Sequence, residues 1–272
     1  MQRFSISPRE MATSFWRNRG LIFTLVRREI AARYRGSVLG MLWSFFNPVF
    51  MLIIYTFVFG VIFKSRWSQG SNSKTEFAIV LFAGLIMFNL FAECVNRAPG
   101  LILANTNYVK RVIFPLEILP WVALGAALFN WGVSFIVWFI FYIIFFGVPH
   151  ITALLLPITL IPFVLIVMGL IWGLASIGVY LRDVSQFIGI IVMAMMFVAP
   201  IFYPITSVPE KYRDLLYLNP LTLAIDEARD VVFWGKVPDV TYYLLYLVCA
   251  LLIAWLGFAW FQKTRKGFAD VL

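Results

Sequence analysis

The sequence predicts an all-α, polytopic membrane protein: six transmembrane helices, an N-terminal amphipathic interfacial helix, and short re-entrant helices on the outer face between spans five and six. Of its 272 residues, 62% are hydrophobic and 13% charged, whereas soluble domains average about 45–50% and about 25%. Residues 118–181 contain no Asp, Glu, Lys or Arg, enough for two crossings of about 20 residues each. These runs are continuous, whereas the strands of a β-barrel, about ten residues long, would alternate in polarity.

The sequence divides into a predicted cytoplasmic arm over residues 1–35 and a predicted membrane domain over residues 36–272. Within the membrane domain, stretches without charged residues predict the spans. Gly147 and Pro149 supply a turn between the third and fourth spans. After the fifth span, apolar runs too short to cross are interrupted at Asn219, which predicts two helices that dip back into the membrane. The spans are expected at about residues 38–63, 77–95, 116–147, 151–181, 184–204 and 240–262, and the outer helices at about 206–236.

Basic residues are concentrated on one side of the predicted membrane. In the arm, Arg27, Arg28, Arg33 and Arg35 alternate with apolar residues at helical spacing, which predicts a basic amphipathic helix in the inner interface; a solvated basic arm is the alternative. Six spans put both termini on one side, together with 15 of the 22 Lys and Arg residues. The termini are therefore predicted to be cytoplasmic. This asymmetry accounts for the net charge of +9, and no nucleic-acid partner is expected.

Motifs for several kinds of chemistry are missing from the sequence. It has no G-x-x-x-x-G-K-[ST] phosphate loop, no H-E-x-x-H, no C-x-x-C and a single histidine, His150. Nucleotide hydrolysis, a metal site, a bound cofactor and catalytic residues are therefore not expected in this chain. Ion-coupled carriers place carboxylates inside the membrane. Here Glu93, Glu117 and Asp183 lie near the inner ends of spans, which disfavours that class.

Aromatic residues make up 18% of the chain and are not confined to the ends of the spans. Those of span three recur at three- and four-residue steps, which places them on one face of a helix. Such a stripe provides flat faces on which sugar rings stack, although lipid contact is the alternative. The candidate channel residues are Trp43, Phe46, Phe50, Trp131, Phe135, Trp138 and Tyr142. In span four, Gly169, Gly173 and Gly178 predict close helix packing.

Three segments resemble one family. They are residues 25–48 (LVRREIAARYRGSVLGMLWSFFNP), residues 105–120 (NTNYVKRVIFPLEILP), and residues 181–209 together with 219–230 (NPLTLAIDEARD). In this order they are similar to the interfacial helix and first span, the entry to span three, and span five with the outer gate helices of ABC-2 type permeases. Members of that family export bacterial polysaccharides such as O-antigen, capsule and teichoic acid.

The resemblance implies a homodimer in the bacterial inner membrane, not an enzyme itself, that binds two copies of a separate ATPase subunit. ATP and Mg²⁺ would be held by that subunit, and the substrate would be a lipid-linked glycan. The ATPase would dock near residues 96–109, and the arginines of the arm would contact lipid headgroups. The implied coupling residues are Arg97, Asn105, Lys110 and Arg111, and the implied outer-gate residues are Tyr203, Asn219, Asp226, Glu227 and Arg229.

Two alternatives remain open. An ABC-2 exporter of a small lipid or drug would share the same architecture. A membrane-embedded enzyme that modifies glycans or lipids would need clustered acidic residues, and Asp226, Glu227 and Asp230 are the one such group on the predicted outer side. Their spacing with Arg229 favours pairing within a short helix instead.

Overall fold

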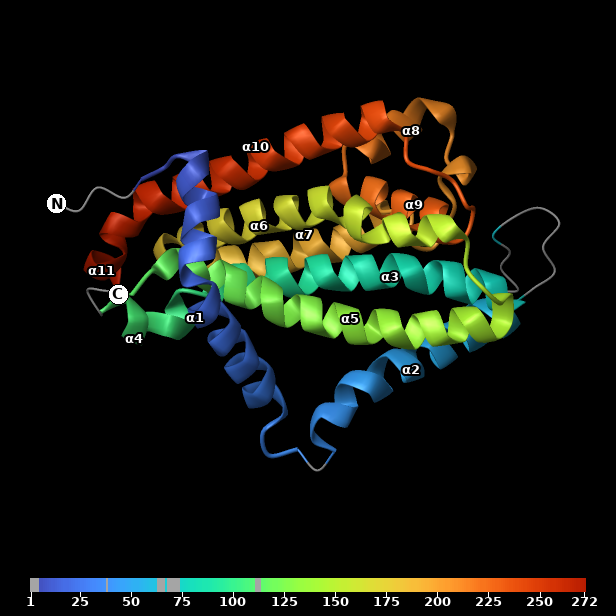
Figure 1. Cartoon of the computed structure of the whole chain (residues 1–272), viewed down its shortest axis with the longest axis horizontal. Coiled ribbons are helices and arrows are strands. Elements are labelled where there is room, and N and C mark those ends of the chain that lie inside the picture. Colours follow the sequence, from blue (N-terminus) through green and yellow to red (C-terminus); the bar gives the residue numbers. More distant parts are fainter. Residues whose placement is uncertain (1–4, 38, 63–66, 68–73, 111–113) are drawn as a thin grey trace.

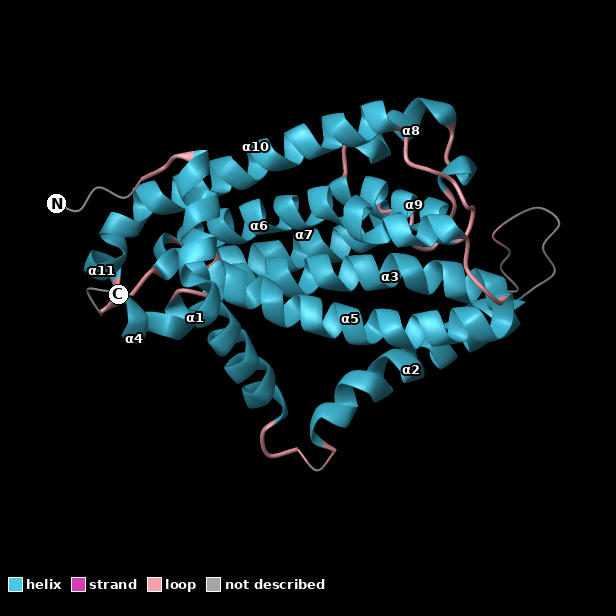
Figure 2. Ribbon diagram, viewed as in Figure 1, coloured by secondary structure: helices cyan, strands magenta, loops and turns pink. Residues whose placement is uncertain are grey.

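A computed structural model gives the fold of the chain, for which it describes residues 5–37, 39–62, 67, 74–110 and 114–272 (Figure 1). This described part is helical and contains no strand (Figure 2), which confirms the all-α class. The α-helices are α1 (Pro8–Tyr34), α2 (Trp43–Tyr55), α3 (Lys74–Arg97), α4 (Thr106–Val109), α5 (Leu119–Phe146), α6 (Leu156–Tyr180), α7 (Val184–Val198), α8 (Glu210–Tyr217), α9 (Pro220–Val232), α10 (Val240–Thr264) and α11 (Phe268–Val271). Short 3₁₀ segments are η1 (Gly40–Leu42), η3 (Ala98–Gly100), η4 (Leu103–Asn105), η5 (Leu116–Ile118), η6 (Ile151–Leu155), η7 (Ile205–Ser207) and η8 (Arg265–Gly267), and η2 (Thr56–Ile62) is a π-helix.

Five helical stretches among the described residues are long and apolar enough to cross a membrane. They are Gly40–Phe59, Glu76–Gly100, Leu116–Phe146, Ile151–Tyr180 and Val240–Val271. The predicted fifth span is shorter than expected, because α7 ends at Val198. Ala199 is extended with ψ 145°, as is typical of a residue that precedes proline. A helix of 15 residues is about 22 Å long, less than the roughly 30 Å of a bilayer core, so six crossings stay a prediction.

α1 begins at a defined cap. The Ser7 hydroxyl accepts a hydrogen bond from the Glu10 N–H at 3.1 Å, and Pro8 occupies the first turn, where its missing N–H has no cost. Ile22 and Leu25 of α1 are buried against the start of α5. The apolar side of α1 is thus covered by protein at these positions, and its place in a membrane interface stays a prediction.

Small residues allow α6 to pack closely against α10 and against η3. A Cβ added at Gly257 of α10 would lie 2.1 Å from the Gly169 carbonyl oxygen, and one at Gly178 would lie 2.0 Å from the Pro99 oxygen. The prediction of close approach is confirmed for Gly169 and Gly178. It is wrong for Gly173, where an added Cβ would meet no described atom outside the helix's own backbone within 4 Å.

The two ends of the helix bundle carry different elements (Figure 1). α4, α11 and the start of α1 lie at one end, which we call the α4 end, whereas α8 and α9 lie toward the other, the α9 end. α8 and α9 occupy the segment in which two short outer helices were predicted. α9 starts where Asn219 accepts from the Leu221 N–H at 3.0 Å and Pro220 follows. Membrane re-entry and gating by these helices stay predictions.

Candidate functional site

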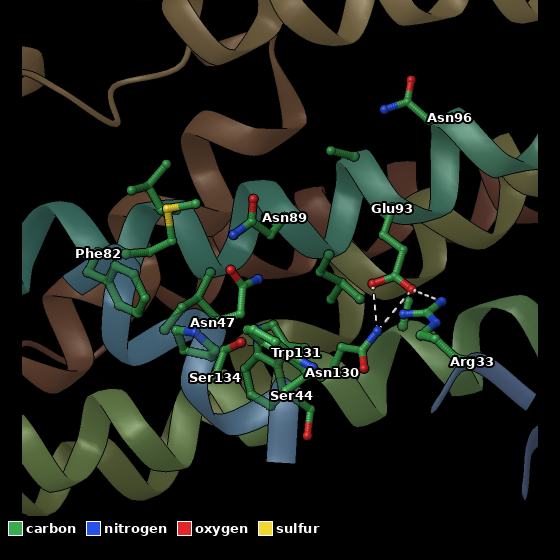
Figure 3. Close-up of a pocket in the computed structure, with 18 of the residues that line it drawn as sticks. Arg33, Ser44, Asn47, Phe82, Asn89, Glu93, Asn96, Asn130, Trp131 and Ser134 are labelled. Carbon is green, nitrogen blue, oxygen red and sulfur yellow. Dashed lines mark hydrogen bonds and ion pairs between the residues drawn. The ribbon is translucent and has the colours of Figure 1, made fainter. Parts of the chain in front are cut away.

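A polar pocket of about 690 Å³ lies among the spanning helices (Figure 3). Its walls come from the end of α1, from α2, and from the facing sides of α3 and α5. Its polar lining consists of Arg33, Tyr34, Ser44, Asn47, Tyr55, Asn89, Glu93, Asn96, Asn130 and Ser134. Its volume falls within the range of about 300–1,000 Å³ typical of ligand sites. A pocket with this polar lining between membrane helices is the strongest candidate for a substrate path.

A hydrogen-bonded group lines the part of the polar pocket nearer the α4 end. The Asn130 amide donates to both carboxylate oxygens of Glu93 at 3.0 Å. The Arg33 guanidinium donates to the same carboxylate at 2.6 Å, and the Tyr34 hydroxyl donates to the Asn130 carbonyl oxygen at 3.4 Å. Burial lowers the pKa of Arg33, but the hydrogen bond and charge of Glu93 outweigh this and raise it overall. The group joins α1, α3 and α5 without leaving a net charge.

The predicted channel aromatics separate into those that line the polar pocket and those that do not. Trp43 and Trp131 line the polar pocket. Trp138 is 2% exposed, and its indole N–H donates to the Ile79 oxygen at 2.9 Å. Tyr142 is buried, and its hydroxyl donates to the Val232 oxygen at 3.2 Å.

Three further predicted aromatics lie outside the lining of the polar pocket. Phe135 stacks on Trp131 with ring centroids 5.2 Å apart. Phe46 packs against Phe50, which is exposed. Helical periodicity predicted which of these side chains lie on the same face of a helix. It did not predict which other helices pack against that face. Their roles in a channel stay predictions.

Helix α1 crosses the α4 end and contacts the predicted coupling segment. The Arg28 guanidinium donates to the Tyr108 hydroxyl of α4 at 2.6 Å, and Tyr108 stacks on Phe114 at 4.2 Å. Glu29 of α1 forms an ion pair with Arg97 at the end of α3. α1 is therefore attached to both sides of the segment in which an ATPase contact is predicted.

The other predicted residues at this end make fewer contacts. The Asn105 amide donates to the Leu101 oxygen of its own turn at 2.9 Å. Arg27, Arg35 and Lys110 are exposed. Arg111 lies outside the described residues. The coupling and headgroup roles of all these residues stay predictions.

Sequence reasoning missed a buried junction at the α4 end. Glu117, 6% exposed, accepts from Arg265 at 2.5 Å and from the Ser14 hydroxyl at 3.1 Å. Its backbone oxygen accepts from the Trp172 indole at 3.2 Å. We call Glu117, Arg265 and Ser14 the Glu117 junction; it ties α1 to η5 and η8. The sequence signal for this junction was that Glu117 directly precedes the charge-free residues 118–181 and that Arg265 closely follows the charge-free residues 240–262.

A buried arginine organises the α9 end. Arg229 of α9, 3% exposed, donates to the backbone oxygens of Val80, Pro200 and Ile201 at 3.1, 2.6 and 3.1 Å. Its guanidinium lies 4.3 Å from the ring centroid of Trp67. Arg229 thus connects α9 to α3 and to the turn after α7. It was predicted as a gate residue, and the contacts place it as a link between these three elements.

Two acidic residues on α9 have perturbed titration. Burial raises the pKa of Asp226 to about 6, against the lowering effect of Arg229, and burial followed by the charge of Asp230 raises the pKa of Glu227 to about 7. Tyr203 donates to the Val198 oxygen at 2.8 Å. Among the described residues there is no group of three or more His, Cys, Asp or Glu that could hold a metal ion.

The comparisons with known proteins agree with an export permease. The family model ABC-2 type transporter matches residues 20–233, and the chain belongs to this family; it is a membrane permease and not an enzyme. It is 25% identical over 262 residues to "O-antigen export system permease protein RfbA" of Myxococcus xanthus, covering 96% of this chain and 98% of the relative. It is 26% identical over 246 residues to "Polysialic acid transport protein KpsM" of Escherichia coli, covering 89% of this chain and 93% of the relative. "Capsule polysaccharide export inner-membrane protein CtrC" of Neisseria meningitidis serogroup B is 25% identical over 262 residues, covering 94% of this chain and 96% of the relative.

Proposed function

We propose that the chain is the permease subunit of an ABC transporter that exports a lipid-linked polysaccharide, of the O-antigen or capsule kind, across the bacterial inner membrane. The observation that carries this proposal is similarity over nearly the full length to relatives named for O-antigen, polysialic acid and capsule export. Their names favour a glycan over a small lipid or drug. They also disfavour a glycan- or lipid-modifying enzyme.

The polar pocket supports a hydrophilic substrate. Polar side chains inside a membrane are costly and face a bundle interior or a water-filled cavity. Here amides and hydroxyls from α2, α3 and α5 face one pocket that also contains the rings of Trp43 and Trp131. A path for a small apolar lipid would not need so many hydrogen-bonding groups.

A separate motor is part of the proposal. The sequence lacks a phosphate loop, so we infer that two ATPase subunits, which hold ATP and Mg²⁺, act on a homodimer of this chain. The resemblance implies docking near residues 96–109, at the α4 end, and the contacts of α1 with Tyr108 and Arg97 attach α1 to that segment. Charge reversal at Arg97 or Lys110 should uncouple ATP hydrolysis from export. Wild-type export by correctly inserted variants would contradict a coupling role.

The orientation follows from the same assignment. We infer that the α4 end faces the cytoplasm and the α9 end faces outward, because most basic residues lie toward the α4 end in the predicted topology. In single-cysteine variants, position 236 should react with a membrane-impermeant thiol reagent from outside, whereas position 110 should not. Labelling of position 110 in sealed cells would overturn this orientation.

Reconstitution tests the function as a whole. The chain is co-purified with its ATPase subunit and placed in vesicles that contain the lipid-linked polysaccharide of the host. ATP should make the glycan accessible on the face opposite the ATPase, and a phosphate-loop variant of the ATPase should abolish this. Transport of a fluorescent short-chain lipid in place of the glycan would support the small-lipid alternative.

A further inference from the structure

Asn89 is an exception within the best-buried helix. In α3, residues 77–91 are all buried apart from Asn89. This asparagine lies near the middle of the candidate span Glu76–Gly100 and faces the polar pocket (Figure 3). A side-chain amide without a partner is costly away from water. Its position therefore indicates that the pocket holds water or a polar ligand at this depth.

Two more polar side chains share this position. Asn47 of α2 and Ser134 of α5 also line the polar pocket and lie near the middle of the spans Gly40–Phe59 and Leu116–Phe146. In the part of the chain that the structure describes, the side chains of Asn47, Asn89 and Ser134 make no hydrogen bond to protein. Three helices thus present open hydrogen-bonding groups to the same space.

The register of α3 and α5 divides the pocket into two polar levels. The helices are antiparallel neighbours (Figure 1). Glu93 follows Asn89 by four residues and Ser134 follows Asn130 by four, so each pair lies on one helix face about 6 Å apart. At the first level, Glu93 is satisfied by Asn130 and Arg33. At the second level, the groups of Asn89 and Ser134 remain open.

We propose that the second level, formed by Asn47, Asn89 and Ser134, is a subsite that binds the hydroxyl groups of a sugar ring during export; this rests on the proposed function. Amide and hydroxyl side chains both donate and accept hydrogen bonds, as sugar hydroxyls do. The charged groups at the first level neutralise each other, and the second level presents only uncharged hydrogen-bonding groups. Trp43 and Trp131 supply flat apolar faces in the same pocket.

The test removes hydrogen bonds while retaining volume. Asn89→Leu, the double variant Asn47→Leu/Asn89→Leu and Ser134→Ala are reconstituted with the ATPase and the host's lipid-linked glycan. Each single change should slow export by roughly two- to tenfold, the range for loss of one neutral hydrogen bond, and the double variant should slow it further. Asn89→Gln, which keeps the amide, should recover part of the rate. Ser185→Ala removes an exposed hydroxyl of α7 outside the polar pocket and should export normally.

A binding measurement separates the subsite from a structural role. Oligosaccharide released by mild acid from the same glycan is titrated into the purified permease, and the Leu variants should bind it more weakly while dimer assembly is unchanged. Wild-type binding and export by the Leu variants and Ser134→Ala would show that the second level is lined by water only. Loss of dimer assembly would assign these residues to contact between copies and overturn the subsite. If the wild-type complex exports no glycan, the proposed function fails instead.

Discussion

Removing the charge of Glu117 should destabilise the α4 end of the bundle. Glu117 receives hydrogen bonds from Arg265 and Ser14, and the side chains of the ion pair are 8% and 11% exposed. Glu117→Gln removes the carboxylate with which the buried Arg265 guanidinium is paired. Removing one partner of a buried pair typically costs about 3–5 kcal/mol, and we expect a loss of this size in the free energy of unfolding.

A second ion pair of the same chemistry provides the matched control. The side chains of Arg33 and Glu93 are 36% and 26% exposed, and pairs that water reaches contribute about 0–1 kcal/mol. Glu93→Gln should therefore cost far less than Glu117→Gln. The double variant Glu117→Gln/Arg265→Met, which removes both charges, should recover most of the stability, because the two sites are coupled.

Denaturant titration of the purified chain in detergent micelles measures these differences, with helix content as the signal. The same variants are then assayed for ATP hydrolysis and export after reconstitution. If Glu117→Gln costs no more than Glu93→Gln, or if the double variant is as unstable as Glu117→Gln, the pair is not buried as described and the reasoning from burial is refuted.

Three further predictions concern packing, pH and the aromatic lining. Gly257→Ala should lower the free energy of unfolding by about 1–3 kcal/mol, because the added Cβ would overlap α6. Gly173→Ala, which has space for a Cβ, should leave the free energy of unfolding unchanged or raise it by up to about 1 kcal/mol. Equal unfolding midpoints for the two variants would contradict this. The pKa of Glu227 rises from 4.5 to about 7 in the folded chain, so the folded state holds more protons and stability should fall as pH rises through this window; Glu227→Gln should remove that part of the slope in unfolding measured against pH. Trp131→Phe should export better than Trp131→Leu, because a flat ring in contact contributes roughly 0.5–1.5 kcal/mol beyond burial, and equal export rates would refute stacking.

Sequence reasoning could predict the helical class because charge-free runs and helical length are local properties. It could not determine where a helix ends when apolar residues favour a longer span and a proline favours an earlier end. The fifth span was expected to reach residue 204, but Pro200 ends α7 at Val198, since the residue before proline avoids the helical conformation. Ile201 and Phe202, which follow this proline, are apolar, and hydrophobicity alone therefore extended the predicted span beyond the end of the helix.

The polar pocket was only partly predictable. Trp43 and Trp131 were identified as aromatic residues of a stripe, but Asn47, Asn89 and Ser134 were not singled out, because an isolated amide in an apolar run has no periodic signal. Their common position depends on which faces of α2, α3 and α5 meet. Which faces meet is determined by packing between helices far apart in sequence. A pattern within one helix does not predict it.

The attachments of α1 differ in strength along its length, and this has a mechanical consequence. Near its start, Ser14 is hydrogen-bonded to the buried Glu117, whereas near its end Arg33 pairs with Glu93 where water reaches both side chains. Between them Arg28 contacts Tyr108 of α4. Because an exposed pair contributes only about 0–1 kcal/mol, we expect a displacement of α4 to open the Arg33–Glu93 contact before it breaks the hydrogen bond of Ser14 to the buried Glu117. We therefore expect motion at the α4 end to reach the polar pocket through the end of α1 that lines it.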